Sequence, residues 1–247
     1  MTIEYRVFGL VGIPEIEPGD DLVAQLADAA DRAGGLERGD VVVVAQKVVS
    51  KAEGRIVRLD DVVASPRAVE LAADRDPRHV QVILDESARI VRSRPPLVIS
   101  ETRHGFVCAS AGVDASNAKG AGTLILLPLD PDASAGALRA GLRERTGADV
   151  GVIVSDSFGR AWRQGTTEVA IGVAGVTALL DLTGRRDGAG YELQGTQIAI
   201  ADELAAAGEL VLGKLRRIPA AVIRGLDAAG DGTGRELVMP AERDLFR

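Results

Sequence analysis

Residues 123–154 constrain the fold most, because they have the pattern of a strand, a helix and a second strand. Residues 123–127 and 150–154 are short apolar runs of strand length. Between them, Asp132 is predicted to cap a helix that ends at Gly147. Two strands connected through a helix form a crossover unit, in which the strands run parallel. The stretch therefore predicts a chain of mixed α and β structure.

Helices and strands are predicted along the rest of the chain as well. The four consecutive valines in residues 41–45 predict a buried strand. No repeat of fixed period and no clear linker interrupts the pattern, so we treat residues 1–247 as one domain within which no boundary can be derived. The other predicted elements are a helix capped by Asp20 over residues 22–33, helices starting at Ser65-Pro66 and Asp76-Pro77, a hairpin over 97–110 that turns near His104-Gly105, a helix over 200–215, and a strand over 220–223.

Composition excludes several classes of protein. The net charge of −7 argues against general binding of nucleic acid, which needs a basic surface. No apolar run approaches the roughly 20 residues of a membrane span, and the N-terminus lacks the pattern of a secretory signal. The single cysteine, Cys108, suits the cytoplasm. His79 and His104 are the only histidines, so a zinc site of His and Cys is strongly disfavoured and any metal is expected to be a hard cation bound by oxygen.

Three polar loops follow predicted strands. In the first, residues 45–55, Lys47 and Lys51 are four residues apart, which puts both ammonium groups on one side of a helical turn. A solvated helix face explains this spacing equally well. In the second, residues 111–122, Asp114 and Asn117 stand among small residues that let a ligand approach the backbone. A plain glycine-rich turn is the alternative there, and it is favoured when that loop is considered alone.

The third loop has the most unusual composition. The apolar run 150–154 stops at Ser155, and Asp156 and Ser157 are predicted to end the strand, where α/β proteins usually present ligand groups. Capping of the next segment by Asp156 is an equally good interpretation. Arg160, Trp162 and Arg163 follow between two glycines. A lone tryptophan is more often packed in a core than used to bind a ligand, so core packing is favoured for Trp162.

Together the three loops supply two carboxylates, a hydroxyl, an amide and several cations. This mixture suits magnesium or manganese beside a polyphosphate, so a metal-dependent phosphoryl-transfer site is the hypothesis. The chain has neither the G-x-x-x-x-G-K-[ST] phosphate loop nor G-x-G-x-x-G after a strand. With two histidines, a Ser-His-Asp triad is also disfavoured.

Six blocks in order resemble those of coenzyme F420:L-glutamate ligases, the gamma-glutamyl ligases that build the polyglutamate tail of a deazaflavin cofactor. They are GIPEIEPGDDL, GDVVVVAQKVVSKAEGR, SAGVDASN, LLPLDPDASA, SDSFGRAWRQG and TQIAIADELA, and they span nearly the whole chain. The resemblance implies a two-lobed α+β fold that forms an intertwined homodimer, with nucleotide bound at the interface. It also implies the use of GTP, two divalent cations (Mg²⁺ or Mn²⁺) and K⁺.

The resemblance also implies roles for individual residues. The nucleotide site would comprise Ile13, Pro14, Glu15, Ile16, Gln46, Lys51, Asn117 and the stretch from Gly195 and Thr196 to Asp202. Gln46 and Ser157 stand where relatives often carry Ser or Thr. The first metal would be bound by Asp114 and Asp156, and the second by Ser157 and Gln197. Arg160 and Lys51 would be catalytic. Arg163 is a candidate for binding an acidic substrate, and so is the pair Arg185-Arg186. A solvated turn is the alternative interpretation of that pair.

The implied reaction has three small-molecule substrates: coenzyme F420-0, L-glutamate and GTP. GTP would phosphorylate the carboxylate of the deazaflavin's phospholactate side chain, and the amine of glutamate would attack the resulting acyl phosphate. Cations would screen the repulsion between carboxylate and phosphate. Two alternatives are a related ligase or kinase acting on another acid, and a nucleotide sensor without turnover.

Overall fold

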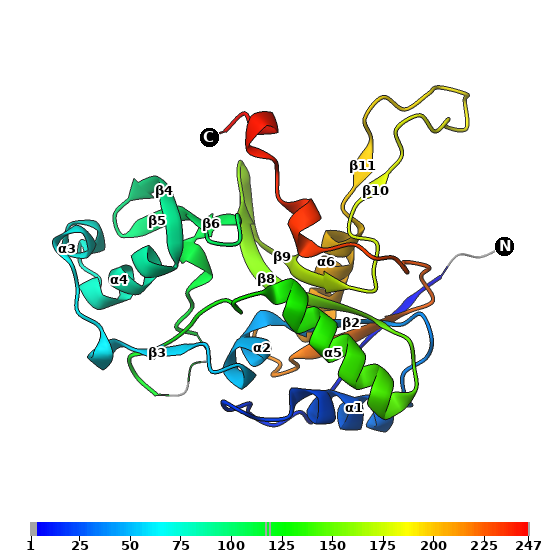
Figure 1. The fold of residues 1–247 in the computed structure, drawn as a ribbon, viewed down its shortest axis with the longest axis horizontal. Coiled ribbons are helices and arrows are strands. Elements are labelled where there is room, and N and C mark those ends of the chain that lie inside the picture. Colours follow the sequence, from blue (N-terminus) through cyan, green and yellow to red (C-terminus); the bar gives the residue numbers. More distant parts are fainter. Residues whose placement is uncertain (1–3, 117, 119, 247) are drawn as a thin grey trace.

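The computed structural model describes residues 4–116, 118 and 120–246, and its centre is a five-stranded mixed sheet (Figure 1). The strands lie in the order β1-β12-β2-β8-β9. Their bounds are β1 Arg6–Gly9, β12 Ala220–Arg224, β2 Val41–Ala45, β8 Gly151–Arg160 and β9 Arg163–Ala174. β2 and β8 run parallel, with Ala45 opposite Ser155, and the other neighbours are antiparallel.

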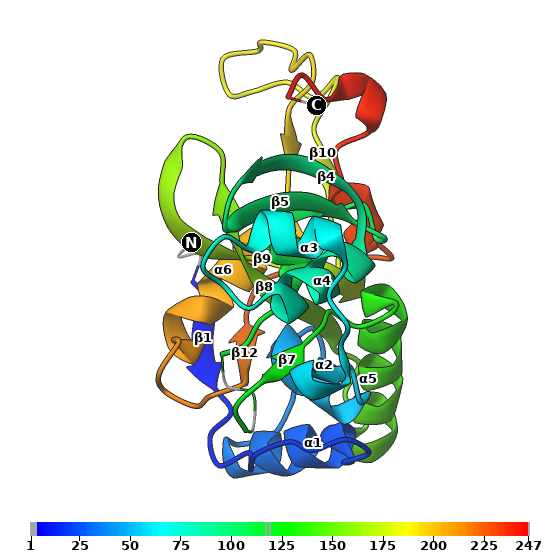
Figure 2. The same ribbon diagram turned by 90° about the vertical axis from the view of Figure 1, so that its left-hand side faces the viewer.

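Helices cover both faces of this sheet, and Figure 2 shows α5 and α6 on opposite sides. The helices are α1 (Leu22–Arg32), α2 (Gln46–Ala52), α5 (Pro131–Thr146) and α6 (Ile200–Leu212). Val42 and Val154 pack with residues of α1 and α5. Ile153 packs with residues of α6. Burial on both faces explains why the strand at 41–45 is a continuous valine run rather than an alternating one.

The chain between α2 and α5 forms a smaller group of elements, at the left of Figure 1. Its own hydrophobic clusters involve residues such as Val82, Ile83 and Leu124. The elements are β3 (Ile56–Arg58), η1 (Leu59–Asp61), α3 (Pro66–Ala72), α4 (Pro77–Glu86), β4 (Ser87–Arg94), β5 (Leu97–Thr102), β6 (Val107–Ala109), η2 (Ser110–Gly112) and β7 (Thr123–Ile125). β3 pairs with β7, while β4, β5 and β6 form an antiparallel sheet.

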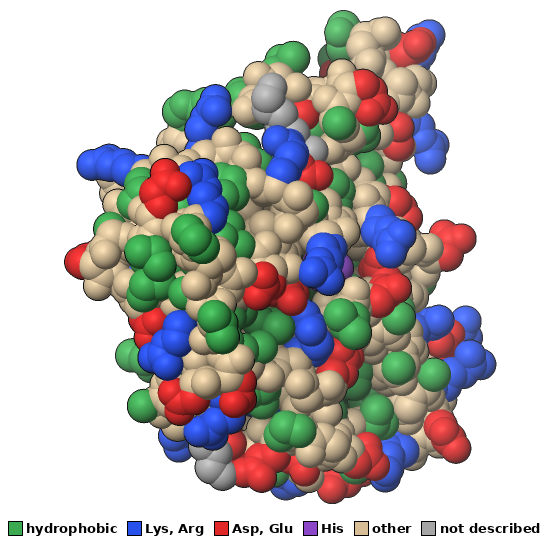
Figure 3. Space-filling model, turned by 60° about the vertical axis from the view of Figure 1, so that its left-hand side comes forward, with side chains coloured by type: hydrophobic (Ala, Val, Ile, Leu, Met, Phe, Trp, Pro, Cys, Tyr) green, Lys and Arg blue, Asp and Glu red, His purple; other side chains and the backbone are tan. Residues whose placement is uncertain are grey.

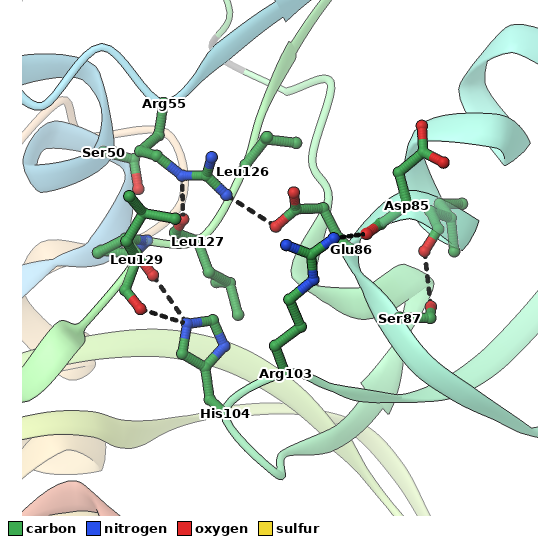
Figure 4. A network of polar contacts seen from close by, with 12 residues as sticks. Ser50, Arg55, Asp85, Glu86, Ser87, Arg103, His104, Leu126, Leu127 and Leu129 are labelled. Atoms are coloured by element: carbon green, nitrogen blue, oxygen red, sulfur yellow. Dashed lines mark hydrogen bonds and ion pairs between the residues drawn. The ribbon is translucent and has the colours of Figure 1, made fainter.

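Polar contacts connect this smaller group to the segment that leads into α5 (Figure 4). Arg55 donates through Nε to the Leu127 carbonyl at 2.9 Å and forms an ion pair of 2.7 Å with Glu86. Nε2 of His104, in the turn between β5 and β6, lies 2.9 Å from the Pro128 carbonyl oxygen. These contacts connect Arg55, the end of α4 and the β5–β6 turn to one another and to the segment before α5.

An arm, residues 180–198, extends from the body and carries the short paired strands β10 (Leu180–Asp181) and β11 (Gln197–Ile198) (Figures 1 and 2). After β12, the chain ends with two short 3-10 helices, η3 (Gly234–Leu237) and η4 (Ala241–Arg243). None of the described helices is both long and apolar enough to cross a membrane.

The α+β class is confirmed, and so are several local predictions. Ser65 and Asp76 cap α3 and α4, each with proline in the first turn. The hairpin over 97–110 is present as β5 and β6. Gly147 ends α5 in the left-handed conformation, with φ of 72°. In these places a short-range signal, such as a cap followed by proline, determines the local structure.

The predicted crossover unit is wrong. β7 pairs antiparallel with β3 in a separate two-stranded sheet, whereas β8 pairs with β2. An apolar run indicates a strand but does not identify its partner, and β7 packs in the cluster of the smaller group. The cap of α5 is Asp130 rather than Asp132. Asp132 instead accepts hydrogen bonds from the backbone N–H groups of Val173 and Gly234.

Three other boundaries differ from the predictions. α1 is capped by Asp21, not Asp20. α6 ends at Leu212, before Gly213, so Leu215 lies outside it and is 93% exposed. β8 does not stop at residue 154 but continues to Arg160, because its polar second half pairs with β9. Asp156 and Ser157 therefore lie within a long hairpin rather than at the end of a strand.

Candidate functional site

A cavity of about 700 Å³ lies at the carboxyl end of β2 and beside the middle of β8, where Ala45 is opposite Ser155. This edge of a parallel pair is where open α/β sheets usually bind ligands. Four segments contribute most of its wall: the 13–16 loop, the first turns of α2, residues 155–157 of β8, and the 212–219 loop that connects α6 to β12. Ala118, Glu168 and Glu209 complete the lining.

The two lysines of α2 point toward carboxylates rather than into solvent. Lys51 is only 6% exposed and pairs with Glu15 of the 13–16 loop. Lys47 Nζ lies 2.6 Å from an oxygen of Asp114 and 2.6 Å from the hydroxyl of Ser116. Spacing of four residues on one helix thus directs both ammonium groups to the site. The alternative of a solvated helix face is wrong for this pair.

Asp114 and Asp156 belong to one electrostatic cluster around Lys47, but their pKa values move in opposite directions. Burial favours a higher pKa for Asp114, yet hydrogen bonds from Lys47 and the Ser116 N–H outweigh it, and the pKa is lowered. Burial, reinforced by the negative charge of Glu168, raises the pKa of Asp156 to about 7. The charge of Asp114 adds to this rise and that of Lys47 opposes it. Asp156 is therefore a half-buried carboxylate whose negative charge a bound cation would stabilise.

Ser157 and Glu168 face each other across the β8–β9 ladder, and the Ser157 hydroxyl donates to Glu168. Glu168 is 6% exposed. Two other buried oxygens of the cavity wall, Oε1 of Gln46 and Oγ of Ser155, have no hydrogen-bond partner within the described part of the chain. Buried polar atoms are normally satisfied, so these two orphaned oxygens indicate a polar ligand in this cavity.

Many of the residues predicted from the resemblance line this cavity. They are Ile13, Pro14, Glu15, Ile16, Gln46, Lys51, Asp156 and Ser157. Asp114 does not line the cavity but contacts Lys47, which does. Asn117 lies outside the described residues. Four segments distant in sequence, including the 13–16 loop and α2, thus supply groups to one region.

Other predicted residues are not brought to this cavity. Gly195, Thr196 and Gln197 are exposed in the arm, where the Gln197 amide donates to Asp181 at 3.1 Å. Asp202 accepts a hydrogen bond of 2.9 Å from the backbone N–H of Ala170, and burial raises its pKa. Arg185 and Arg186 are also exposed in the arm. These side chains contribute to the arm or to the packing of α6 on β9.

The tip of the β8–β9 hairpin carries Arg160, Trp162 and Arg163 away from the cavity lining. Trp162 has a positive φ of 58° and is 80% exposed. Its ring lies 4.7 Å from that of Phe246, which is itself 68% exposed. The prediction that Trp162 packs in the core is therefore wrong. The two-residue turn that carries Trp162 lies at the end of a projecting hairpin, where the contact with Phe246 leaves most of the indole exposed.

Sequence reasoning missed several residues of the cavity wall. Glu168 is adjacent to Ser157 only through the strand ladder, which no local motif reveals. Lys214 and Arg217 follow α6, and the described part of the chain offers neither of them an ion pair or a hydrogen bond. The cluster of cations after Gly213 and before Pro219 was the available signal. The predicted helix over 200–215 includes Lys214, so this cluster is not recognised as a loop in the sequence.

Neither sign of charge dominates the visible surface. On the face in Figure 3, basic and acidic side chains are interspersed, and no broad basic patch is visible. Such a surface does not suit the phosphate backbone of a nucleic acid. The cavity instead combines carboxylates (Asp156, Glu168, Glu209) with cations (Lys51, Lys214, Arg217). This pattern suits a small polar ligand that carries both signs of charge.

Comparison with known proteins assigns the chain to a family. Residues 11–225 match the F420-0:gamma-glutamyl ligase family. The chain belongs to this family. It is similar to the coenzyme F420:L-glutamate ligase of Methanothermobacter thermautotrophicus, with 43% identity over 98% of each chain. The corresponding protein of Methanopyrus kandleri is 47% identical over 94% of each chain, and that of Methanocaldococcus jannaschii 46% identical over 86% of each. The sequence-based prediction of a ligase enzyme is thus confirmed at the level of the family.

Proposed function

We propose that this protein is a GTP-dependent ligase that adds L-glutamate to coenzyme F420-0 and extends a gamma-linked polyglutamate tail. The observation that carries the proposal is the cavity at the end of β2 and the middle of β8, where a half-buried carboxylate, Asp156, adjoins the Lys47–Asp114 pair in a member of this ligase family. The names of the similar proteins support the choice of substrates. A cytoplasmic location stays a prediction.

The 13–16 loop and the 212–219 loop are the proposed nucleotide walls. Lys51 is paired with Glu15 of the first loop, and Lys214 and Arg217 belong to the second. A triphosphate bound beside these loops would meet several cations, which is the usual protein contribution to phosphoryl transfer. The preference for GTP rests on the family resemblance.

The residues present fit a divalent cation. Mg²⁺ in phosphoryl-transfer sites is usually bound through one or two carboxylates together with substrate phosphates and water. Asp114 and Asp156 would supply the carboxylates, and the raised pKa of Asp156 indicates that burial leaves its negative charge poorly compensated. When bound, such a cation neutralises charge that develops on the phosphoryl oxygens. Ser157 and the orphaned oxygen of Gln46 remain available for a second divalent ion or for K⁺.

Gln197 is not retained as a metal ligand in this proposal. Its amide is engaged by Asp181 within the arm. Arg160 is likewise kept only as a candidate for contact with the deazaflavin substrate, since it lies near the exposed hairpin tip. Lys51 keeps its proposed role at the nucleotide.

The reaction proceeds in two displacements. A carboxylate oxygen of F420-0 attacks the γ-phosphorus of GTP, and the bond to the bridging oxygen breaks, with GDP taking the electron pair. The amine of L-glutamate, having lost a proton, then attacks the acyl carbon, and the carbon–oxygen bond to phosphate breaks. Phosphate leaves with that electron pair, and an amide forms. The cations of the cavity reduce the repulsion between the two anions that must meet in the first displacement.

A homodimer is also part of the proposal. The arm projects from the body and exposes Tyr191 at 62% and Leu180 at 38%. Exposed apolar residues on a projecting arm are suited to contact with a second copy of the chain. Analytical ultracentrifugation of the protein, with and without the arm residues replaced by a short linker, tests this part by itself.

Product analysis tests the reaction most clearly. Purified protein is incubated with Mg²⁺, L-glutamate and GTP, with and without F420-0, and the products are identified by mass spectrometry. The proposal predicts phosphate release that depends on F420-0, together with a product heavier by one or more glutamyl groups. Phosphate release with a different acid would instead identify a related ligase or kinase. Tight GTP binding without any release would identify a sensor.

A further inference from the structure

The outer half of the β8–β9 hairpin is an exposed surface that leads away from the cavity (Figures 1 and 2). Asp156 and Ser157 line the cavity, whereas residues 159–166 are all exposed. Gly159 and Gly165 border open space, because a side chain added at either would meet nothing beyond its chain neighbours within 4 Å. A molecule that extends out of the cavity along β8 therefore follows an open strip to the hairpin tip.

The tip carries an aromatic pair that the fold does not bury. The rings of Trp162 and Phe246 lie 4.7 Å apart and are tilted by 57°, so they are not stacked face to face. Trp162 is 80% exposed and Phe246 is 68% exposed. Aromatic side chains stabilise a fold mainly through the area that they bury, so this pair contributes little to the folded state. Its exposed ring faces suit a planar aromatic ligand.

Trp162 stands at a turn position that disfavours its own side chain. It is the second residue of a two-residue turn between Arg160 and Arg163, and its φ is 58°. Hairpin turns with positive φ usually carry Gly, Asn or Asp at such positions. A bulky residue in this conformation is strained, and strain of this kind is concentrated at sites that hold ligands. The turn thus presents an indole where a smaller residue would be more stable.

Two guanidinium groups flank the indole. Arg160 and Arg163 are opposite each other at the end of the β8–β9 ladder. Arg160 makes a long hydrogen bond of 3.4 Å to the Gln164 carbonyl, and neither arginine has an ion pair within the described residues. Arginine stacks on aromatic rings and binds phosphate or carboxylate oxygens. The tip therefore complements a ligand that combines a flat ring with negative charge.

The distance from Asp156 to the tip matches the length of the proposed deazaflavin substrate. A strand rises about 3.3 Å per residue, so Arg160 lies about 13 Å from Asp156 along β8, and the turn follows directly. An extended chain covers about 1.2 Å per bond, so the roughly ten bonds from the phospholactate carboxylate to the ring span about 12 Å. With that carboxylate beside Asp156, where phosphoryl transfer is proposed, the ring reaches the tip.

We propose that the hairpin tip binds the planar ring of the deazaflavin substrate: Trp162 and Phe246 contact its faces, while Arg160 and Arg163 contact its polar edge and the anionic chain attached to it. The inference rests on the proposed function and names the subsite of the substrate that is phosphorylated. It assigns to the exposed tip a binding role separate from that of the nucleotide and divalent-cation site.

Fluorescence tests this contact directly, because Trp162 is the only tryptophan of the chain. F420-0 is titrated into the wild-type protein with GDP and Mg²⁺ present, and N-acetyltryptophanamide corrects for light absorbed by the deazaflavin. Saturable quenching of the indole emission is expected. Phospholactate, which lacks the ring, should cause none. Constant emission at F420-0 concentrations that saturate the protein would overturn the inference.

Substitutions at the tip test its contribution to affinity. Trp162→Ala should raise the KM for F420-0 about 10-fold, equal to about 1.4 kcal/mol, and leave the KM values for GTP and L-glutamate unchanged. Trp162→Phe, which keeps an aromatic ring, should restore most of the affinity. Tyr5→Ala is the matched control, because Tyr5 is a 57% exposed aromatic residue that does not line the cavity, and it should change no KM. Equal increases for all three substrates in Trp162→Ala, or an unchanged KM for F420-0, would overturn the inference.

Sedimentation separates this role from contact with a second copy of the chain. Trp162→Ala should sediment like the wild type. A lower mass together with unchanged F420-0 affinity would identify the tip as a subunit contact and overturn the inference. If F420-0 quenches the wild-type protein but no glutamate is ligated, the proposed function fails and the ring subsite stands. Ligation without quenching overturns the subsite alone.

Discussion

The raised pKa of Asp156 makes the affinity for divalent cations depend on pH. Burial and the charge of Glu168 raise this pKa to about 7, and a protonated carboxyl binds a metal ion poorly. With that value, the ionised fraction falls about 10-fold between pH 8 and pH 6, so Mn²⁺ affinity should fall about 10-fold over the same interval. Titration of Mn²⁺ followed by electron paramagnetic resonance measures this affinity directly. Asp156→Asn, which is neutral at every pH, should bind Mn²⁺ weakly and lose this dependence.

The same carboxyl links pH to the stability of the metal-free protein. The folded protein keeps a proton on Asp156 that the unfolded chain has already released, so stability decreases as pH rises from the unfolded value of 3.8 toward 7. Between pH 5 and pH 8 the expected loss is about 3 kcal/mol relative to Asp156→Asn, measured by urea unfolding. A parallel pH dependence of stability in wild type and variant, with pH-independent Mn²⁺ affinity, would refute this reasoning.

Three further substitutions test other parts of the structure. Lys51→Ala should weaken GTP binding about 10- to 100-fold by calorimetry while Mn²⁺ affinity is retained; unchanged GTP affinity would exclude Lys51 from the nucleotide site. Gln197→Ala should leave Mn²⁺ affinity unchanged, because the Gln197 amide donates a hydrogen bond to Asp181 in the arm. A marked loss of Mn²⁺ affinity would show that Gln197 is a metal ligand after all. Arg224→Ala should lower the free energy of unfolding by about 3–5 kcal/mol, because it leaves the Asp40 carboxylate, 1% exposed, without its paired hydrogen bonds of 2.9 and 2.7 Å. A loss below about 1 kcal/mol would show that water replaces the arginine.

Local signals in the sequence predicted local structure well, and pairing between distant strands poorly. Ser65 and Asp76, each before a proline, determine helix starts through contacts within one turn. The run 123–127 was correctly read as extended, but its partner is β3 and not β8. Strand partners depend on which hydrophobic cluster buries each strand, and an apolar run carries no information about that choice.

In the candidate site, too, residues with a local sequence signal could be predicted and residues placed by strand pairing could not. Lys47, Asp114 and Asp156 could be proposed from their loops because each lies next to a strand or helix end with a recognisable pattern. Glu168 could not, since it meets Ser157 only through the register of β8 and β9. Lys214 and Arg217 reach the cavity because α6 stops at Gly213, one turn earlier than its apolar periodicity suggests.

The central claim is that the carboxylates of Asp114 and Asp156 bind one divalent cation against a triphosphate. A crystal structure with Mn²⁺ and a non-hydrolysable GTP analogue, with diffraction recorded near the manganese absorption edge, tests it most directly. The account predicts an anomalous peak between these two side chains, in contact with phosphate oxygens. A fully occupied nucleotide with no peak there, or with manganese only on other residues, would contradict it.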